Sequence, residues 1–319
     1  MERILVTGGA GFIGSHLVES LLASGKEVTV LDDFTDYYDP ALKERNVAGF
    51  VDEVKMVRGN IEDGELVERL FKDGKFEAVV HLAARAGVRP SIEKPRAYFK
   101  TNVDGTLNLV EACRNHGTGR FIFGSSSSVY GVNRKVPFSE EDRIERTISP
   151  YAATKLTGEQ ICSNYSHLFG IEAVCLRFFT VYGPRQRPDL AISKFTDRIL
   201  KGESIPQYGD GSTARDYTYV EDIVQGIRAA LEYQESRFDI FNLGGSETTR
   251  LSELISHLEE LCGKEAKIEL LPEQPGDVPR TFADTSKAIN ILGYRPGTNI
   301  RQGLAKYVEW HRGNVFPGA

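Results

Sequence analysis

The chain has 319 residues, of which 45 are acidic and 39 basic, so its formal net charge is −6. Hydrophobic residues make up 40% of the chain and charged residues 26%, as in an ordinary globular protein with a large core. The acidic balance argues against a nucleic-acid-binding protein. No apolar run approaches the roughly 18 residues of a membrane helix, and no signal-peptide pattern opens the sequence. We therefore expect a cytoplasmic protein of about two domains with no membrane partner.

The four cysteines are scattered and form no C-x-x-C pair; they are Cys113, Cys162, Cys175 and Cys262. This spacing favours reduced structural thiols over a disulfide framework, and it predicts no metal site. A chain of this length can build a stable hydrophobic core without cross-links.

Short apolar runs alternate with amphipathic segments along the first half of the chain. The apolar runs predict strands at Ile4–Val6, Val28–Leu31, Lys55–Arg58, Ala78–Leu82, Arg120–Gly124 and Ala173–Phe178. Helical patterns lie between them, including about His16–Ala23, Ala97–Asn115 and Tyr151–Leu168. Because strands that alternate with helices form right-handed βαβ units, we expect an α/β fold with a Rossmann-type, doubly wound parallel sheet.

The pattern changes after about Thr180. Residues 182–188 are basic and rich in turn formers, and further turns or loops are expected at 209–212 and 275–277. Helices are expected at Ile192–Lys201, Leu251–Cys262, Ser286–Leu292 and Ile300–Gly313. We therefore expect a first domain at 1–180 and a smaller α/β substrate domain at 181–319. The two are partly interleaved, because residues 217–232 are expected to return to the first domain.

Three glycines lie between the first expected strand and the first expected helix: Gly8, Gly11 and Gly14. Glycine at these positions permits a tight turn, close approach of a pyrophosphate and close packing of helix on strand. The helix N-terminus, which includes Phe12 and Ile13, supplies N–H donors and the positive end of a dipole. Such a turn, with an acidic residue at the end of the second strand, predicts a dinucleotide-binding site.

Asp32 is that acidic residue, with Asp33 beside it. A carboxylate here accepts hydrogen bonds from both hydroxyls of the adenosine ribose and repels a 2′-phosphate, and no arginine stands in its place. The sequence therefore predicts NAD as the cofactor in preference to NADP. The alternative is that Asp32 only caps the loop after its strand.

Tyr151 and Lys155 lie four residues apart in an expected helix, so their side chains share one face. Because an ammonium near a phenol favours the phenolate, we expect the pKa of Tyr151 to fall below its usual value of about 10. Such a tyrosine can act as a general base toward a sugar hydroxyl. The strand that ends at Gly124 runs into four serines at 125–128, which either hydrogen-bond the reacting oxygen or form only a polar loop.

Longer stretches carry a resemblance to a known family. In the first half these are TGGAGFIGSHL at 7–17, HLAA at 81–84, TNVDGTLNLVEAC at 101–113, SSSSVYG at 125–131 and SPYAATKLTGE at 149–159. In the second half they are RFFTVYGPRQRPD at 177–189, GDGSTARDYTYVED at 209–222, FNLGG at 241–245 and PGDVPRTFADTSKA at 275–288. With these motifs the chain resembles, over nearly its whole length, an extended short-chain dehydrogenase/reductase of the nucleotide-sugar epimerase/dehydratase family.

The resemblance implies roles for individual residues. Tyr151 would act as the base, Lys155 would tune it and bind a ribose of the cofactor, and Ser126 would hydrogen-bond the reacting hydroxyl. Other contacts to the cofactor would come from Asn60, Ile61, Ala83, Ala84 and Asn102. One departure is Asn60, where relatives often carry an aspartate beside the adenine; its amide still offers a hydrogen bond.

Members of this family begin with hydride transfer from sugar C4 to NAD, which gives a 4-keto sugar. Related dehydratases and UDP-glucuronate decarboxylases then use carboxyl groups just before the V-Y-G motif, where this chain has Ser127 and Ser128. The resemblance therefore argues against both reactions and implies an epimerase, in which the hydride returns to the other face of C4. Both serines are kept as candidate catalytic residues.

The sugar is suggested by the segment around Thr180. FFTVYGP followed by RPD resembles UDP-glucuronate 4-epimerases, whereas galactose epimerases tend to carry Asn in place of Thr180. An arginine here can pair with the C5 carboxylate, and we expect Arg187 to do so, with Arg185 as the second choice. The resemblance also implies that the nucleotide diphosphate is bound by Arg215, Asp277 and Arg280.

The resemblance thus implies an NAD-dependent isomerase that converts UDP-glucuronic acid to UDP-galacturonic acid with tightly bound NAD. Three alternatives remain: a UDP-glucose or UDP-N-acetylglucosamine 4-epimerase, a UDP-glucuronate decarboxylase, and a non-catalytic NAD-binding regulatory protein. The resemblance also implies a homodimer in which the helices at 97–115 and 151–168 pair across a two-fold axis. Otherwise the apolar stripes of these helices only cover the sheet.

Overall fold

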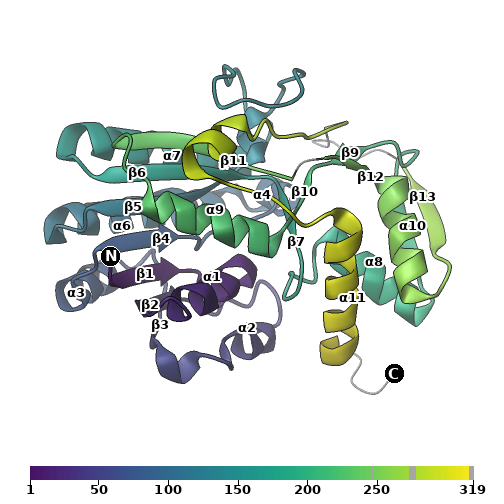
Figure 1. Cartoon of the computed structure of the whole chain (residues 1–319), viewed down its shortest axis with the longest axis horizontal. Coiled ribbons are helices and arrows are strands. Elements are labelled where there is room, and N and C mark those ends of the chain that lie inside the picture. Colours follow the sequence, from purple (N-terminus) through teal and green to yellow (C-terminus); the bar gives the residue numbers. More distant parts are fainter. Residues whose placement is uncertain (246, 273–277, 316–319) are drawn as a thin grey trace.

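The computed structural model describes residues 1–245, 247–272 and 278–315. At its centre is a seven-stranded sheet in the order β11-β6-β5-β4-β1-β2-β3, with every neighbouring pair parallel (Figure 1). The strands are β1 (Arg3–Thr7), β2 (Glu27–Asp32), β3 (Lys55–Arg58), β4 (Ala78–His81), β5 (Arg120–Ser126), β6 (Glu172–Phe178) and β11 (Phe238–Leu243). The chain builds outward from β1 in both directions, which confirms the predicted doubly wound sheet.

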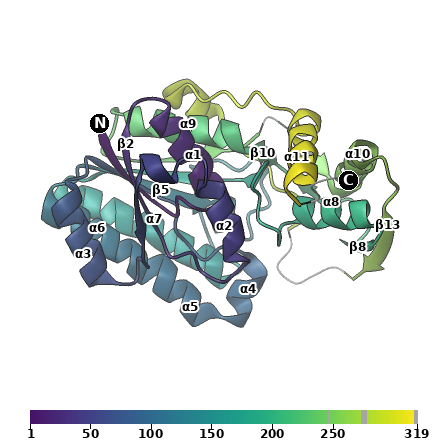
Figure 2. The same cartoon turned by 90° about the horizontal axis from the view of Figure 1, so that it is seen from below.

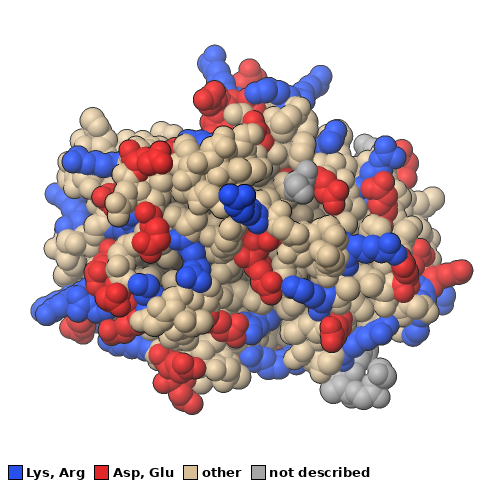
Figure 3. Space-filling view, viewed as in Figure 1, with Lys and Arg blue, Asp and Glu red and all other residues tan. Residues whose placement is uncertain are grey.

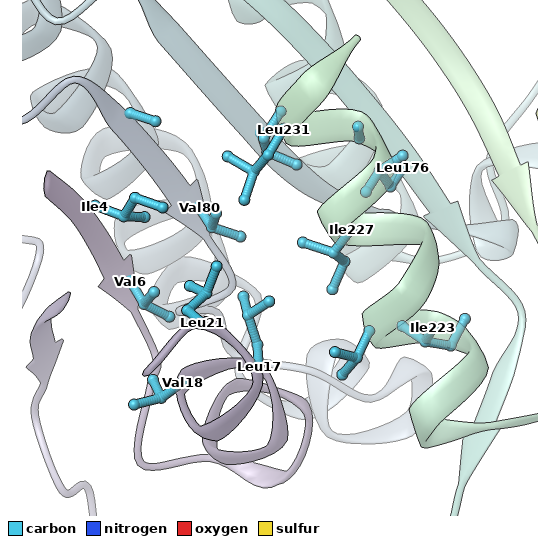
Figure 4. Packing of buried hydrophobic residues seen from close by; sticks show 14 of the residues in the cluster. Ile4, Val6, Leu17, Val18, Leu21, Val80, Leu176, Ile223, Ile227 and Leu231 are labelled. Carbon is cyan, nitrogen blue, oxygen red and sulfur yellow. The ribbon is translucent and has the colours of Figure 1, made fainter. Parts of the chain in front are cut away.

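Helices cover both faces of this sheet. One face carries α1 (Phe12–Leu22) and α9 (Val220–Glu232), and the other carries α3 (Gly64–Gly74), α6 (Gly105–His116) and α7 (Pro150–Phe169). Ile4 and Val6 of β1 join the core beneath α1 and α9, whereas Leu5 joins the opposite core. Figure 4 shows Leu17 of α1 and Ile227 of α9 meeting above the sheet. Both faces are therefore buried, as parallel sheets require.

The ends of α7 follow from its local sequence. The Ser149 hydroxyl accepts a hydrogen bond from the N–H of Ala152 at 3.1 Å, and Pro150 occupies the first turn. Gly170 ends the helix in the left-handed region with φ +74°. These caps fix the helix that periodicity predicted at Tyr151–Leu168.

The long helix expected at Ala97–Asn115 is interrupted. The structure has α5 (Pro95–Phe99), a π-helical turn η2 (Lys100–Asp104) and then α6. Within η2, Thr101 and Asn102 direct their side chains to Arg85 in the loop after β4. Hydrophobic periodicity gives no sign of such a turn, and π-helical turns are frequent at functional sites.

A second group of elements packs around its own core beside the main sheet (Figures 1 and 2). Its helices are α8 (Ala191–Lys201), α10 (Leu251–Cys262) and α11 (Ile300–Val315). Its paired strands are β7 (Thr180–Tyr182) with β10 (Tyr217–Tyr219), β8 (Ser204–Tyr208) with β13 (Lys267–Leu271), and β9 (Ala214–Arg215) with β12 (Thr249–Arg250). The remaining short elements are α2 (Pro40–Val47), η1 (Val51–Glu53), α4 (Val88–Glu93), η3 (Ser127–Tyr130) and η4 (Ala288–Leu292).

The chain returns to the main sheet after residue 180. Helix α9 lies against α1, and β11 pairs with β6 at the edge of the sheet. Strand β11 was not predicted, because Asp239 and Asn242 interrupt its apolar run. Both are anchored: Asp239 accepts a hydrogen bond from the Tyr233 hydroxyl at 2.7 Å, and Asn242 Nδ2 donates to Phe138 O at 2.9 Å. The division of the chain near residue 180 remains a prediction.

The surface and the cysteines agree with an ordinary globular chain. Figure 3 shows acidic and basic side chains interspersed over one face of the molecule. All four cysteines are buried as free thiols. Within the described ranges, none of the helices combines the length and the apolar character needed to cross a membrane.

Candidate active site

A cavity of about 380 Å³ lies at the carboxyl ends of the central strands. This is where ligands bind in doubly wound sheets, next to the point where the strand order reverses. Most residues that the sequence analysis singled out line it: Gly8, Gly11, Phe12, Ile13, Gly14, Asp32, Asn60, Ile61, Ala83, Ala84, Ser126, Tyr151, Lys155, Thr180 and Arg187. Segments far apart in the sequence therefore meet around one space.

The glycine turn is built so tightly that side chains are excluded. Gly8 has φ +72°, and a Cβ atom there would lie 2.7 Å from the backbone N of Ala83. A Cβ on Gly14 would lie 2.2 Å from the carbonyl oxygen of Gly8. Gly11 precedes α1 and leaves its first N–H groups without a side-chain cap. The turn thus brings free N–H donors and a helix dipole to the cavity, which fits the pyrophosphate of a dinucleotide.

Asp32 is buried at the end of β2, 3% exposed, and its carboxylate lines the cavity. It accepts hydrogen bonds from the N–H groups of Ala10 at 3.1 Å and Phe34 at 2.9 Å. Lys43 of α2 donates to it at 2.6 Å and lies 3.7 Å from Asp33. These contacts fix the carboxylate at the rim where a ribose would bind. Lys43 was not predicted, because nothing in its own segment distinguishes it from an exposed helix lysine.

Asn60 and Ile61 lie at the same end of the cavity, just after β3. The Asn60 side-chain Oδ1 accepts a hydrogen bond from the backbone N–H of Glu62 at 2.9 Å, and its Nδ2 lies 3.4 Å from Asp33 Oδ2. Ile61 is buried, 3% exposed, against the opposite core of the sheet. The Asn60 side chain therefore stabilises the turn after β3 at this end of the cavity.

A chain of hydrogen bonds supports the wall formed by Ala83. The N–H of Ala83 donates to Thr7 Oγ1 at 3.3 Å, and Thr7 Oγ1 lies 2.7 Å from His81 Nδ1. His81 Nε2 lies 3.0 Å from Thr106 Oγ1, which donates to Asn102 O at 2.6 Å. Burial lowers the pKa of His81 to about 3, so the ring is neutral. Because Thr106 Oγ1 donates its own proton to Asn102 O, it can only accept from His81, which assigns the ring proton to Nε2. Every donor in this series of hydrogen bonds, from Ala83 to Asn102, has an acceptor.

Asn102 stands behind the cavity wall and does not line it. Its side-chain Oδ1 accepts from the backbone N–H of Arg85 at 2.8 Å, and its Nδ2 donates to Arg85 O at 2.9 Å and Thr154 Oγ1 at 3.0 Å. It therefore ties the loop after β4 to helix α7. Arg85 does line the cavity, and its place directly after the HLAA motif was the signal that could have identified it.

Tyr151, Lys155 and Ser126 meet on one side of the cavity. Lys155 Nζ donates to Gly124 O at 2.7 Å and lies 6.0 Å from the centre of the Tyr151 ring. The ring of Tyr98 in α5 packs edge-on against Tyr151, with centroids 6.3 Å apart. The predicted pair thus shares one helix face, next to the end of β5.

The pKa of Tyr151 differs from the prediction. Burial raises it above the usual value, while a hydrogen bond from Ser126 and the nearby charge of Arg187 lower it in part. Burial also lowers the pKa of Lys155 to about 8, against the opposing charge of Glu159. The expected fall of the Tyr151 pKa below its usual value is therefore wrong for this structure. Lys155 donates to Gly124 O, and desolvation of the phenol dominates.

A buried ion pair lies beneath Lys155. Arg177 of β6 binds Glu159 of α7 through two hydrogen bonds, Nε to Oε1 at 2.9 Å and Nη2 to Oε2 at 2.8 Å. The Ser125 hydroxyl donates to the same carboxylate at 2.6 Å. This network joins β5, β6 and α7 under the catalytic face, and sequence reasoning missed it.

The serine run divides into two groups. Ser126 lines the cavity, while Ser127 and Ser128 lie in η3 outside it. The N–H and the hydroxyl of Ser128 lie 3.2 Å and 3.0 Å from Ser126 Oγ, so Ser128 orients Ser126. Neither position supplies a carboxyl group to the cavity.

The two arginines after β7 point in different directions. Arg187 lines the cavity and binds Asp189 through two hydrogen bonds of 2.9 Å and 2.7 Å. Arg185 has left-handed backbone, φ +65°, and pairs with Glu19 of α1 at 2.6 Å. Arg185 therefore lies outside the main cavity, which corrects its place as second choice for the sugar carboxylate.

Arg215 and Arg280 also lie outside the cavity. They come together in the second group of elements, where Ala214 forms a β-bridge with Arg280. Arg215 Nη1 donates to Ala214 O at 3.0 Å, and Arg280 Nη2 donates to Thr248 Oγ1 at 3.2 Å. Asp277, the third residue expected to bind the diphosphate, lies outside the described residues.

Comparisons with known proteins agree with this geometry. The model of the NAD dependent epimerase/dehydratase family matches residues 4–244. UDP-glucuronate 4-epimerase 4 of Arabidopsis thaliana is 44% identical over 97% of this chain and 75% of its own length. A Bacillus cereus UDP-glucuronic acid 4-epimerase, crystallised with UDP-glucuronic acid and NAD, has a TM-score of 0.91 and 38% identity, covering 97% of this chain and 98% of that chain. The UDP-glucose 4-epimerase of Thermus thermophilus in complex with NAD has a TM-score of 0.90 and 37% identity, covering 98% of this chain and 100% of that chain.

The chain therefore belongs to the NAD dependent epimerase/dehydratase family. The glycine turn, the buried carboxylate at the end of β2 and the Tyr151–Lys155 pair are all present in one cavity. Within that family it is an NAD-dependent nucleotide-sugar 4-epimerase, and its cofactor is NAD.

Proposed function

We propose that this epimerase interconverts UDP-glucuronic acid and UDP-galacturonic acid. The observation that carries the proposal is that Arg187 and Thr180 line the same cavity as Tyr151, Lys155 and Ser126. A guanidinium beside the catalytic groups suits a sugar with a carboxylate at C5. Relatives and a structural neighbour named for UDP-glucuronate 4-epimerase activity support the same substrate.

The proposal assigns the cofactor to the residues that fit it. The Gly8–Gly14 turn and the N-terminus of α1 would hold the pyrophosphate, and Asp32 the adenosine ribose. NAD, when bound, supplies the acceptor and donor of the hydride at sugar C4. Lys155 lines the same cavity and would bind a ribose of the cofactor through its ammonium, which Glu159 helps to keep charged.

Tyr151 would take the proton from the C4 hydroxyl during oxidation and return it during reduction. Ser126 would hold the same hydroxyl, since it lines the same side of the cavity and lowers the pKa of the Tyr151 phenol. For the configuration to invert, the sugar ring must turn over between the two steps. Arg187 and Thr180 would keep the C5 carboxylate bound while this happens, away from the geometry in which the β-keto acid formed by oxidation at C4 loses carbon dioxide.

Neutral nucleotide sugars and decarboxylation are the competing activities. The first is favoured by the Thermus neighbour, which is a UDP-glucose 4-epimerase. The second is opposed by the serines at positions 127 and 128, which supply no carboxyl group. The two alternatives are separated from the proposal by the identity of the substrate and of the product.

The test is a proton NMR time course with the purified protein and no added NAD. UDP-glucuronic acid, UDP-glucose and UDP-N-acetylglucosamine are supplied in parallel. The proposal predicts UDP-galacturonic acid from the first, formed at least about tenfold faster than either neutral sugar reacts, because one charge-assisted pair contributes about 1.5 to 3 kcal/mol. A UDP-pentose product, or faster turnover of a neutral sugar, would contradict it.

A homodimer is also proposed. Of the nine large hydrophobic residues exposed among the described residues, five lie on helices α4 to α7: Ile92, Phe99, Leu107, Leu168 and Phe169. Such a concentration of apolar surface is typical of a protein interface. The proposed partner is a second copy of this chain.

A further inference from the structure

The guanidinium of Arg187 already holds a carboxylate in this structure. Arg187 Nε lies 2.9 Å from Asp189 Oδ1, and Arg187 Nη2 lies 2.7 Å from Asp189 Oδ2. The two side chains are 18% and 33% exposed, so the pair is partly shielded from water. This two-point contact is the arrangement that an arginine would offer to the carboxylate of an acidic sugar.

The surroundings of Arg187 explain why it needs a partner when the cavity holds no acidic ligand. The guanidinium lies 5.5 Å from the centre of the Tyr37 ring and close enough to Tyr151 for its charge to lower the pKa of that phenol. Aromatic neighbours desolvate the charge, and an uncompensated charge in such a place is costly. Asp189 removes that cost.

The surroundings of Asp189 favour its negative charge even without Arg187. Asp189 lies two residues before Ala191, where α8 begins, and no side chain caps that helix. A carboxylate near a helix N-terminus is stabilised by the free N–H groups and the dipole. The charge of Lys194, in the first turn of α8, also lowers the pKa of Asp189. A carboxylate displaced from the arginine therefore remains in favourable electrostatic surroundings.

We infer that Asp189 is a specificity-determining residue that stands in for the substrate carboxylate on Arg187 and is displaced by an acidic sugar. The inference rests on the proposed function. A neutral sugar offers no group that can displace Asp189, so it meets a neutral, filled site. An acidic sugar exchanges one carboxylate for another, so the charge of Arg187 stays compensated throughout.

The experiment is to measure the dissociation constants of UDP-glucuronic acid and UDP-glucose by calorimetry, with the NAD-loaded protein and its Asp189→Asn variant. Asparagine keeps the shape and removes the competing charge. UDP-glucuronic acid is expected to bind about twofold to fivefold more tightly to the variant, as suits the loss of one partly exposed competing pair. The dissociation constant of UDP-glucose is expected to be the same for the variant and the wild-type protein. Glu260→Gln, which breaks the exposed pair of Glu260 with Arg301, is the matched control and should change neither constant.

The origin of the effect is tested in a second background. If the tighter binding comes from releasing Arg187, then Asp189→Asn added to Arg187→Ala must give no gain. A gain that persists without Arg187 overturns the inference, as does unchanged or weaker binding in the single variant. Asp189→Ser replaces Asp189→Asn if the melting temperature shows that the amide disturbs the loop. Failure of the wild-type protein to bind or convert UDP-glucuronic acid would instead overturn the proposed function.

Discussion

At the scale of single residues, the site is governed by desolvation as much as by charge. Burial raises the pKa of Tyr151 and lowers that of Lys155 to about 8. Two groups oppose the effect on Tyr151: the hydroxyl of Ser126 and the guanidinium of Arg187. Both favour the phenolate, which is the form a general base requires. The ability of Tyr151 to act near neutral pH therefore depends on these two neighbours.

This predicts a pH-dependent defect in a Ser126→Ala variant. Loss of the hydrogen bond removes a contact that favours the phenolate, so the pKa of Tyr151 rises further. The rising limb of kcat against pH should then move to higher pH, and kcat at neutral pH should fall about tenfold to a hundredfold. Ser24→Ala, which removes a hydroxyl from an exposed helix end, should leave the profile unchanged. A limb that stays in place or moves to lower pH would show that Ser126 does not tune Tyr151.

The residues of the site could be predicted where a motif fixes both position and direction. The glycine turn, Asp32 and the Tyr151–Lys155 pair lie in the cavity because strand ends and helix faces determine where they point. Arg185 could not be placed in this way. Its side chain pairs with Glu19, far away in the sequence, and its backbone is left-handed; its own segment reveals neither feature.

At the scale of elements, the strands of the main sheet were the most predictable feature. Their apolar runs are short and separated by helical patterns, and six of the seven strands of the sheet were predicted from these runs. Strand β11 and the π-helical turn η2 were missed for physical reasons. In β11 polar residues are satisfied by distant partners, and in η2 the extra residue per turn is stabilised by contacts with the loop after β4.

The tight turn between β1 and α1 gives a prediction at this scale. A methyl group on Gly14 would lie 2.2 Å from the carbonyl oxygen of Gly8, so Gly14→Ala must open the turn. The expected cost is about 1 to 3 kcal/mol of unfolding free energy, together with loss of the NAD that copurifies with the protein. Thermal unfolding and the amount of NAD released on denaturation measure both effects.

Gly119→Ala provides the control for this change. No atom lies within 4 Å of a Cβ placed on Gly119, and its backbone is not in the left-handed region. This variant should retain its NAD and its melting temperature. Normal NAD content in Gly14→Ala would contradict the role given to the turn.

At the scale of the whole molecule, the exposed apolar residues on α4 to α7 predict self-association. Leu168 is 66% exposed at the end of α7, and Phe169 beside it is 42% exposed. Burying a charge in an apolar interface is costly, so Leu168→Glu should shift the protein from dimer to monomer. Sedimentation velocity measures the change, and Leu270→Glu, on the exposed strand β13, is the control with a similar exposure of 70%. A wild-type protein that sediments as a monomer would contradict the proposed dimer.

The most direct test of the proposed function follows the hydrogen at C4 of the sugar. UDP-glucuronic acid labelled with deuterium at C4 is incubated with the protein, without added NAD, and the product is examined by NMR and mass spectrometry. The proposed function predicts UDP-galacturonic acid that keeps its deuterium at C4, because the same hydride leaves and returns within one closed site. Product that carries solvent hydrogen at C4, or that has lost carbon dioxide, would contradict it.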